Sequence, residues 1–173
     1  MFRTLIAAGA LALAPLTVAT AQEAGPTDAQ IAHIAWTAGQ LDIAAAEQAL
    51  EKSRNPEVRA FAELMARDHA AVNEQAVALV TKLAVTPEDN ATSAALTEAA
   101  KATHDRLAAL EGAAFDAAYV ANEVAFHRTV NGALEGTLIP EADNAELKAL
   151  LETGLSLFRS HQTHAEHLAG SVR

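Results

Sequence analysis

Apolar residues recur along most of this chain at every third or fourth position, which is the spacing of one face of an α-helix. The clearest apolar stripe comprises Phe61, Met65, Val72, Leu79 and Leu83. A second stripe comprises Tyr119, Phe126, Val130 and Leu134. No stretch sustains the alternation of apolar and polar residues that is typical of strands, and strong helix formers dominate every long segment. The pattern therefore predicts an all-α fold.

The ends of the helices are placed by residues that start or stop them. Thr27 with Gln30 matches a capping box, and Gly136 and Pro140 are strong helix breakers. A short joint before Pro56 should make the first two helices antiparallel neighbours. We expect helices over residues 28–53 and 56–83, from a Thr92 or Ser93 cap to about Glu111, over residues 113–134, and from Asp143 or Asn144 onward.

Several ionisable side chains occupy positions that the stripes assign to the core. Asp42 lies within the apolar face of the first helix, and Glu123 and His127 point into the second stripe. His161 continues the apolar face of the last helix. A carboxylate in such a position needs a partner, because burying an unpaired charge is costly.

Counting along the helices at about 1.5 Å per residue indicates which of these groups share a level. Asp42 and His69 each lie about 18 to 21 Å from the joint between their helices, so they should meet. If the chain turns near Ile139, His127 and His161 lie at different distances from that turn, and the difference along the helices is about 15 Å. We therefore expect two polar layers: Asp42 with His69, Glu123 and His127, and a separate layer of Asp116, Tyr119 and His161.

Imidazole and carboxylate groups together suit Zn, Cu, Fe or Mn, so these layers are candidate sites for a divalent transition metal. The candidate ligands are Asp42, His69, Glu123, His127, His161 and Asp116. The alternative is a buried polar network, in which each histidine pairs with a carboxylate and fixes the register of an alanine-rich bundle. The ferritin-like di-iron motif, glutamate three residues before histidine, does not occur in the chain.

His161, His164 and His167 form a run at intervals of three. Adjacent members lie about 60° apart around a helix, so they would share an ion only weakly at the surface, and a solvated helix end is the alternative. Nucleophilic catalysis has little support, because the chain has no cysteine and no Gly-x-Ser-x-Gly elbow. The sequence favours a binding protein over an enzyme.

The first 21 residues match a secretory signal peptide. They contain one basic residue, Arg3, then an apolar run from Leu5 to Val18 and the small-x-small residues Ala19-Thr20-Ala21. The run is too short for a permanent membrane span. We expect cleavage near Ala21, a single domain over residues 22–173, and a periplasmic or secreted location.

Charge and composition narrow the choice of partners. The chain has 12 Lys and Arg against 22 Asp and Glu, a net charge of −10, and removing Arg3 leaves 11 against 22, or −11. Such a surface repels phosphate backbones and anionic lipids, so nucleic acid is not an expected partner. Because there is no cysteine, disulfides are excluded and any metal must be held by nitrogen and oxygen.

A group of these residues resembles a known family. The group comprises Gly39-Gln40-Leu41-Asp42, the block from Phe61 to His69, Phe115-Asp116-Ala117-Ala118-Tyr119, His127 and His161. Together with the signal peptide, it resembles the bacterial domain-of-unknown-function 4142 family over essentially the whole mature chain. The resemblance implies an exported, ferritin-like up-down four-helix bundle with an additional shorter helix. It implies no settled activity.

Two classes of function remain open. The first is an exported metal-binding protein that serves in storage, buffering or protection of the envelope against stress. The second is a non-enzymatic structural or interaction protein of the envelope, whose inward histidines and carboxylates form only a core polar network. Metal bound after native purification would distinguish them, while the partner protein and the oligomeric state stay undetermined.

Overall fold

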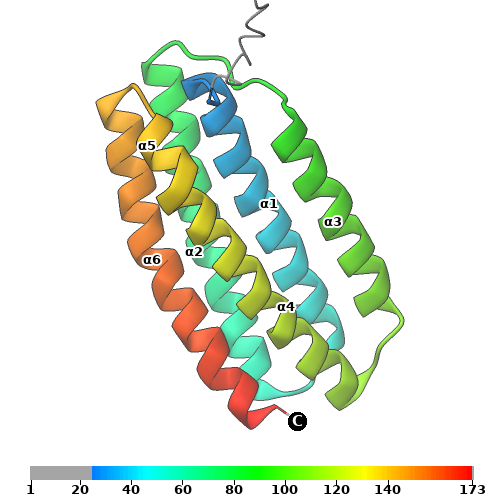
Figure 1. The fold of residues 1–173 in the computed structure, drawn as a ribbon. Helices are drawn as coiled ribbons and strands as arrows, with labels where there is room; N and C mark the ends of the chain where they lie inside the picture. The colour runs from blue at the N-terminus through cyan, green and yellow to red at the C-terminus, as the bar shows by residue number, and fades with distance from the viewer. Residues whose placement is uncertain (1–24, 173) are drawn as a thin grey trace, which may run out of the picture.

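The structure, a computed structural model, describes residues 25–172, which form an all-α bundle (Figure 1). In chain order the elements are α1 (Asp28–Lys52), α2 (Pro56–Lys82), α3 (Ala91–Ala108), α4 (Gly112–Ala133), the π-helical turn η1 (Leu134–Leu138), α5 (Ile139–Glu141) and α6 (Ala145–Ser171). These residues contain no strand, which confirms the all-α prediction. Among them, no helix has both the length and the apolar character needed to cross a membrane. The predicted signal peptide lies outside the described residues.

Side-chain caps begin the helices close to the predicted positions. Thr27 and Gln30 form the expected capping box at the start of α1, and Asn144 caps α6. The cap of α3 differs from the prediction, because Asn90 takes this position instead of Thr92 or Ser93. Ser93 is the third helical residue, and its hydroxyl and the Asn90 side chain each bond to the other residue's backbone N–H. The helix therefore begins earlier than the sequence indicates.

The four long helices form two antiparallel pairs. The pairs are α1 with α2 and α4 with α6, and α1 and α6 run in one direction while α2 and α4 run in the other (Figure 1). An ion pair between Lys82 and Glu146 joins the end of α2 to the start of α6. Helix α2 and helix α4 run in parallel because α3 lies between them in the chain and returns alongside α1.

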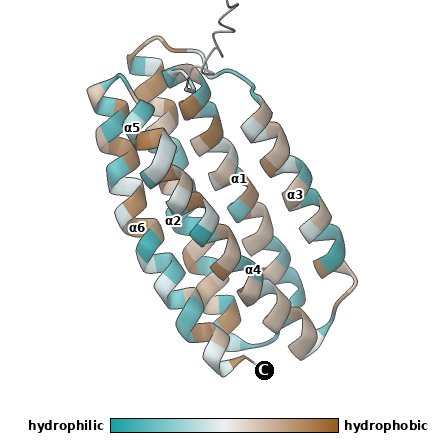
Figure 2. Cartoon of the chain, in the orientation of Figure 1, coloured by the Kyte–Doolittle hydropathy of each residue, from teal (hydrophilic) through white to brown (hydrophobic). Residues whose placement is uncertain are grey.

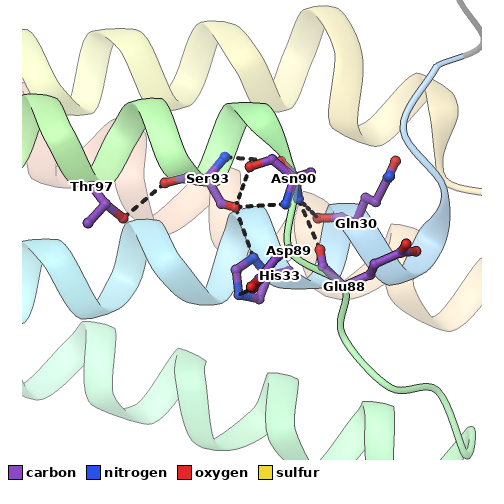
Figure 3. Close-up of polar contacts among 7 residues, drawn as sticks. All are labelled: Gln30, His33, Glu88, Asp89, Asn90, Ser93 and Thr97. Atoms are coloured by element: carbon purple, nitrogen blue, oxygen red, sulfur yellow. Dashed lines mark hydrogen bonds and ion pairs between the residues drawn. The ribbon is translucent and has the colours of Figure 1, made fainter.

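Polar contacts attach α3 and the loop before it to the outside of α1. Near the start of α3, the ring of His33 contacts the Ser93 hydroxyl at 3.0 Å and Asp89 at 2.9 Å (Figure 3). Further along, Gln48 donates to the carbonyl of His104 over 3.0 Å. The Ser93 hydroxyl is buried and also bonds to the Asn90 backbone, so it holds the helix cap and is not presented as a nucleophile.

The chain does not turn at Gly136 and Pro140, which corrects the predicted end of the fourth helix at Leu134. Helix α4 continues through η1 and α5 as far as Glu141. In η1 the N–H of Ile139 donates to the carbonyl of Leu134, one residue further back than in an α-helix. Pro140 follows directly in α5, where its missing N–H removes one hydrogen bond from the continuous helix. The reversal therefore falls at residues 142–144.

Two apolar cores fill the bundle, one toward each end. The core nearest the α1–α2 joint contains Phe61, Met65, Phe115 and Tyr119, and the other contains Ile31, Ile34, Leu134, Leu151 and Phe158. Each fully buried side chain of this size contributes about 1.5–3 kcal/mol. Figure 2 shows hydrophobic and hydrophilic residues on each long helix, as expected for helices that bury one face. Between the two cores lies a layer of polar side chains.

Candidate metal centre

The polar layer between the cores draws on all four long helices. It contains Asp42 of α1, His69 of α2, Glu123 and His127 of α4, and His161 of α6, each no more than 2% exposed. The structure thus brings together the four residues that the sequence placed in one layer, and it adds His161. These side chains lie at the same height along the four helices. They therefore form one layer between the two apolar cores.

Three histidines in this layer face one another. Nitrogen atoms of His69, His127 and His161 lie within 4.8 Å of each other, and the ring centroids are 5.4–5.6 Å apart. Phe158 stacks on the His69 ring at a centroid distance of 4.6 Å. Metal–imidazole bonds of about 2.0–2.1 Å would need the rings to move slightly closer together around one ion.

Two of these rings are held through the nitrogen that points away from the others. His127 donates from Nδ1 to the Glu123 carbonyl over 3.0 Å, and its Nε2 has no hydrogen-bond partner among the described residues. His161 donates from Nε2 to Asp68 Oδ2 over 3.0 Å, and its Nδ1 is likewise unpaired. Such outer partners fix the tautomer and orient a metal-ligating histidine. Each ring therefore keeps one buried nitrogen whose lone pair is free to bind an ion.

The third ring lies against a carboxylate. Nε2 of His69 is 3.0 Å from Asp42 Oδ2, as the matched level of the two residues predicts. Despite this short distance, the Nε2 and Oδ2 atoms do not form a hydrogen bond. Both ring nitrogens of His69 therefore lack a hydrogen-bond partner within residues 25–172. His69 can therefore turn one nitrogen to an ion while Asp42 supports the other.

A second group of donor atoms adjoins the three histidines. It consists of Asp42, Glu123 and His127, again with atoms within 4.8 Å of one another. The Glu123 carboxyl lies 3.7 Å from His127 Nδ1. His127 belongs to both groups, so the carboxyl groups lie directly beside the histidine cluster.

Comparison with known proteins places the chain in a family. A family model for a domain of unknown function, DUF4142, matches residues 13–168. The chain belongs to the DUF4142 family. Among curated proteins, none gives a significant match.

Two solved structures resemble this DUF4142 protein. One is a DUF305 protein presumed to be secreted, from Streptomyces coelicolor, with a TM-score of 0.71 and 15% identity over 83% of this chain and 92% of that chain. The other is CopM in its Cu(II)-bound form, with a TM-score of 0.64 and 15% identity over 85% of this chain and 98% of that chain. At this identity the likeness shows a shared helical fold.

The two carboxyl groups in the polar layer of the DUF4142 protein have pKa values shifted in opposite directions. Burial raises the pKa of Glu123 well above its usual value, and the neighbouring Asp42 raises it further. Burial also opposes ionisation of Asp42, but the rings of His69 and His127 outweigh it and lower the pKa of Asp42 to about 2. The Glu123 carboxyl therefore releases its proton at a higher pH than the Asp42 carboxyl does. Tyr119 is neutral, because burial, Glu123 and Asp42 raise its pKa well above 10.0.

Burial favours the neutral form of two histidines of the layer, His127 and His161. Burial lowers the pKa of His127, although Asp42 opposes the shift. Burial lowers the pKa of His161 to about 4, against the opposing hydrogen bond to Asp68. Metal binding requires deprotonated imidazole, so these two rings hold the correct protonation state without an ion.

The predicted second layer of Asp116, Tyr119 and His161 does not form. His161 joins the three-histidine cluster, whereas Tyr119 packs against Phe61 and Phe115. Asp116 is buried but belongs to neither donor group of the described chain. The error arises from the turn: with the reversal at residues 142–144 instead of 139, His127 and His161 lie about equally far from it.

Asp68 is the site residue that the sequence pattern did not single out. Its side chain is 18% exposed, so it lies at the edge of the core and not within it. Partial burial opposes its charge, but hydrogen bonds from His161 and Arg67 hold the pKa of Asp68 below its usual value. The sequence feature that could have identified Asp68 is its position next to His69, because a carboxylate at the edge of the core can reach the neighbouring helix.

The run of three histidines on α6 divides between core and surface. His161 is buried, while His164 and His167 are exposed. His164 packs edge-on against the Phe61 ring at 5.1 Å. Neither exposed histidine is part of the donor groups in residues 25–172.

Proposed function

We propose that this protein binds a transition-metal ion in the polar layer, with His69, His127 and His161 as ligands and Asp42 and Glu123 beside them. The observation that carries the proposal is a close group of three buried histidines, each with at least one unpaired ring nitrogen. Leaving a buried polar group unpaired costs about 1–3 kcal/mol. One ion would satisfy three such groups together.

The donor set limits the choice of metal. Imidazole suits Zn, Cu, Fe and Ni, and carboxylate extends the range to Mn. The fold likeness to CopM, whose structure holds Cu(II), makes Cu(II) the first ion to test. Zn(II) is the second, because three histidines with one open position is a known arrangement for it.

The proposed role is metal storage, buffering or protection against stress outside the cytoplasm. Two antiparallel helix pairs joined by one long crossover, here containing α3, support the proposal that the bundle is ferritin-like. The signal peptide proposed for residues 1–21 would deliver the chain to the periplasm or the exterior. The proposal is for a single domain over residues 22–173 that binds metal, and it includes no catalytic step.

Thermal unfolding of metal-free protein with and without Cu(II) or Zn(II) tests this function. At a hundredfold excess of free metal over its Kd, binding to the folded state stabilises by about 2.7 kcal/mol. At about 2–4 °C per kcal/mol for a chain of this size, the Tm should rise by about 5–11 °C. The double substitution His69→Ala with His127→Ala should remove most of the rise.

A matched pair of surface histidines provides the control. His164→Ala with His167→Ala removes the same number of imidazoles from exposed positions on α6 and should leave the rise largely intact. If the surface pair removes the effect and the buried pair does not, the layer is a structural polar network and the proposed function is wrong.

A further inference from the structure

A cavity of about 500 Å³ lies between the polar layer and the end of the bundle where α1 begins. His69, Asn73 and His127 line it at the polar layer. Its exposed lining residues include Thr92 of α3 and Thr129 of α4, so it reaches solvent on the side where these two helices lie. A volume of about 300–1,000 Å³ is usual for sites that bind small molecules.

The lining of this cavity carries no fixed charge. Within the described chain, its lining residues include no Asp, Glu, Lys or Arg, and most are Ala, Val, Leu, Ile or Phe. At about 30 Å³ per molecule, such a volume corresponds to on the order of 15 waters. An ordered water needs 2–4 polar partners, and these walls supply few. The chemistry of the lining therefore favours an uncharged, apolar molecule.

The cavity extends along the axis of the bundle. Its lining residues run along α4 and η1 from Phe126 to Leu138, and along α6 from Leu147 to Phe158. At about 1.5 Å of rise per residue, each of these spans is about 16 to 18 Å. An extended chain advances about 1.2 Å per bond, judged from about 3.3–3.6 Å per three-bond peptide residue. The cavity thus fits a linear chain of about 13 to 15 bonds.

One end of the cavity offers a hydrogen-bond donor. Asn73 is 6% exposed, lines the cavity, and has an Nδ2 without a partner among the described residues. It lies one helical turn from His69, on the same side of α2. An unpaired amide N–H is satisfied by a carbonyl oxygen.

We propose that this cavity binds a linear hydrocarbon chain that ends in an uncharged carbonyl group, such as an acyl ester. The carbonyl oxygen accepts from Asn73 Nδ2, and the chain extends between α4 and α6 toward the start of α1. This inference goes beyond metal binding and does not depend on it. The carbonyl end lies beside the polar layer, so the two sites are neighbours.

Displacement of a neutral fluorescent probe tests the site. Metal-free mature protein is loaded with N-phenyl-1-naphthylamine, and methyl dodecanoate or dodecanoate is added at pH 8. The methyl ester should displace the probe at a concentration at least tenfold lower than the carboxylate, because the lining has no cation to pair with the charge. Equal displacement by the two compounds, or no probe binding at all, overturns the proposal.

Substitutions then locate the site. Ala35→Leu with Ala133→Leu fills the cavity from two helices and should abolish probe binding, while Ala149→Leu, at an exposed position on α6 outside the cavity, should not. Thermal unfolding checks that each variant folds. Undiminished probe binding by a folded Ala35→Leu, Ala133→Leu protein contradicts the assignment.

Two further variants distinguish ester binding through Asn73 from metal binding through His161. Asn73→Leu should weaken the methyl ester about fivefold to tenfold, the effect of losing one hydrogen bond, and leave the affinity for the probe within twofold. His161→Ala removes a proposed metal ligand that does not line the cavity, so it should reduce metal binding and leave the ester affinity unchanged. An ester affinity insensitive to Asn73→Leu overturns the proposed contact, whatever the metal results are.

Discussion

At the scale of single residues, Asp68 illustrates how a side chain outside the polar layer controls what happens within it. Its carboxylate accepts a hydrogen bond from Nε2 of His161 and also pairs with Arg67. The hydrogen bond fixes which His161 nitrogen carries the proton, and therefore which nitrogen is free to bind an ion. Asp68 does for His161 what the Glu123 carbonyl does for His127.

Asp68→Ala should weaken metal binding about tenfold to a hundredfold without removing a ligand, which is the usual cost of losing such an outer partner. Competition against a chelator of known affinity measures the change. Asp105→Ala is the control, because Asp105 is an exposed aspartate that also accepts from a neighbouring base, Lys101. An affinity that does not respond to Asp68→Ala would show that His161 is not a ligand.

Acid should destabilise the metal-free protein through His161. Its pKa is about 4 in the folded state against 6.5 for the free side chain. As the pH falls below 6.5, the His161 ring binds a proton in the unfolded chain but stays neutral in the folded chain. Protonation therefore favours unfolding. The stabilisation is complete above pH 6.5 and is lost between pH 6.5 and pH 4.

Comparison with the variant His161→Asn isolates the effect of His161 on stability. The folded pKa of Glu123 is raised, so Glu123 changes stability with pH in the opposite direction, but it does so in both proteins. The difference in Tm between the metal-free wild type and the variant should become smaller as the pH is lowered from 7 to 4. A difference that stays constant over this range contradicts the assignment.

At the scale of helices, the approach of α1 to α2 depends on Gly39. A Cβ placed there would lie 2.9 Å from the Cγ of Asn73 and overlap the end of that side chain. Asn73 is buried, so its side chain has little room to move away. The two helices can therefore lie closely side by side only with glycine at this position.

Gly39→Ala should destabilise the protein by about 1–3 kcal/mol, the usual cost of overpacking. Gly132→Ala should instead stabilise it by roughly 0.5–1 kcal/mol, because Gly132 lies in α4 with open space around its Cα and alanine is the better helix former. Urea unfolding of the two variants measures both changes. A neutral or stabilising Gly39→Ala would mean that Asn73 is free to reorient.

The helices and their buried faces could be predicted from the sequence because they depend on local periodicity. Asp42 and His69 could be matched because a short joint at Asn55 and Pro56 fixes the register of their helices. His161 could not be matched, because Gly136 and Pro140 normally end a helix and a π turn that retains them leaves no mark in the periodicity. The contacts of His33 with Ser93 and Asp89 were also beyond prediction, since they depend on where the loop before α3 crosses α1.

At the scale of the whole molecule, the charge bears on the proposed metal binding and the N-terminal segment bears on the proposed export. The chain carries a net charge of −10, which attracts metal cations and repels anionic surfaces. The first helix of the described residues begins at Asp28, so removal of residues 1–21 would leave the helices of residues 25–172 intact.

Expression with the native leader should therefore give an exported protein whose first residue is Gln22, as measured by mass spectrometry of the periplasmic and culture fractions. Leu11→Arg with Leu13→Arg, which interrupts the apolar run, should retain the protein in the cytoplasm with its leader attached. Export that persists in this variant, or a mature protein that keeps residues 1–21, would contradict the proposed signal peptide.

The distribution of the proposed ligands over the chain has a consequence for how the protein would obtain its ion. His69, His127 and His161 come from three different helices, and the last lies near the C-terminal end. No partial chain that lacks α6 can assemble the set, so metal capture must follow completion of the fold. A protein exported unfolded would therefore be loaded at its destination, and the ion that it carries would be decided by the metal supply there and not by that of the cytoplasm.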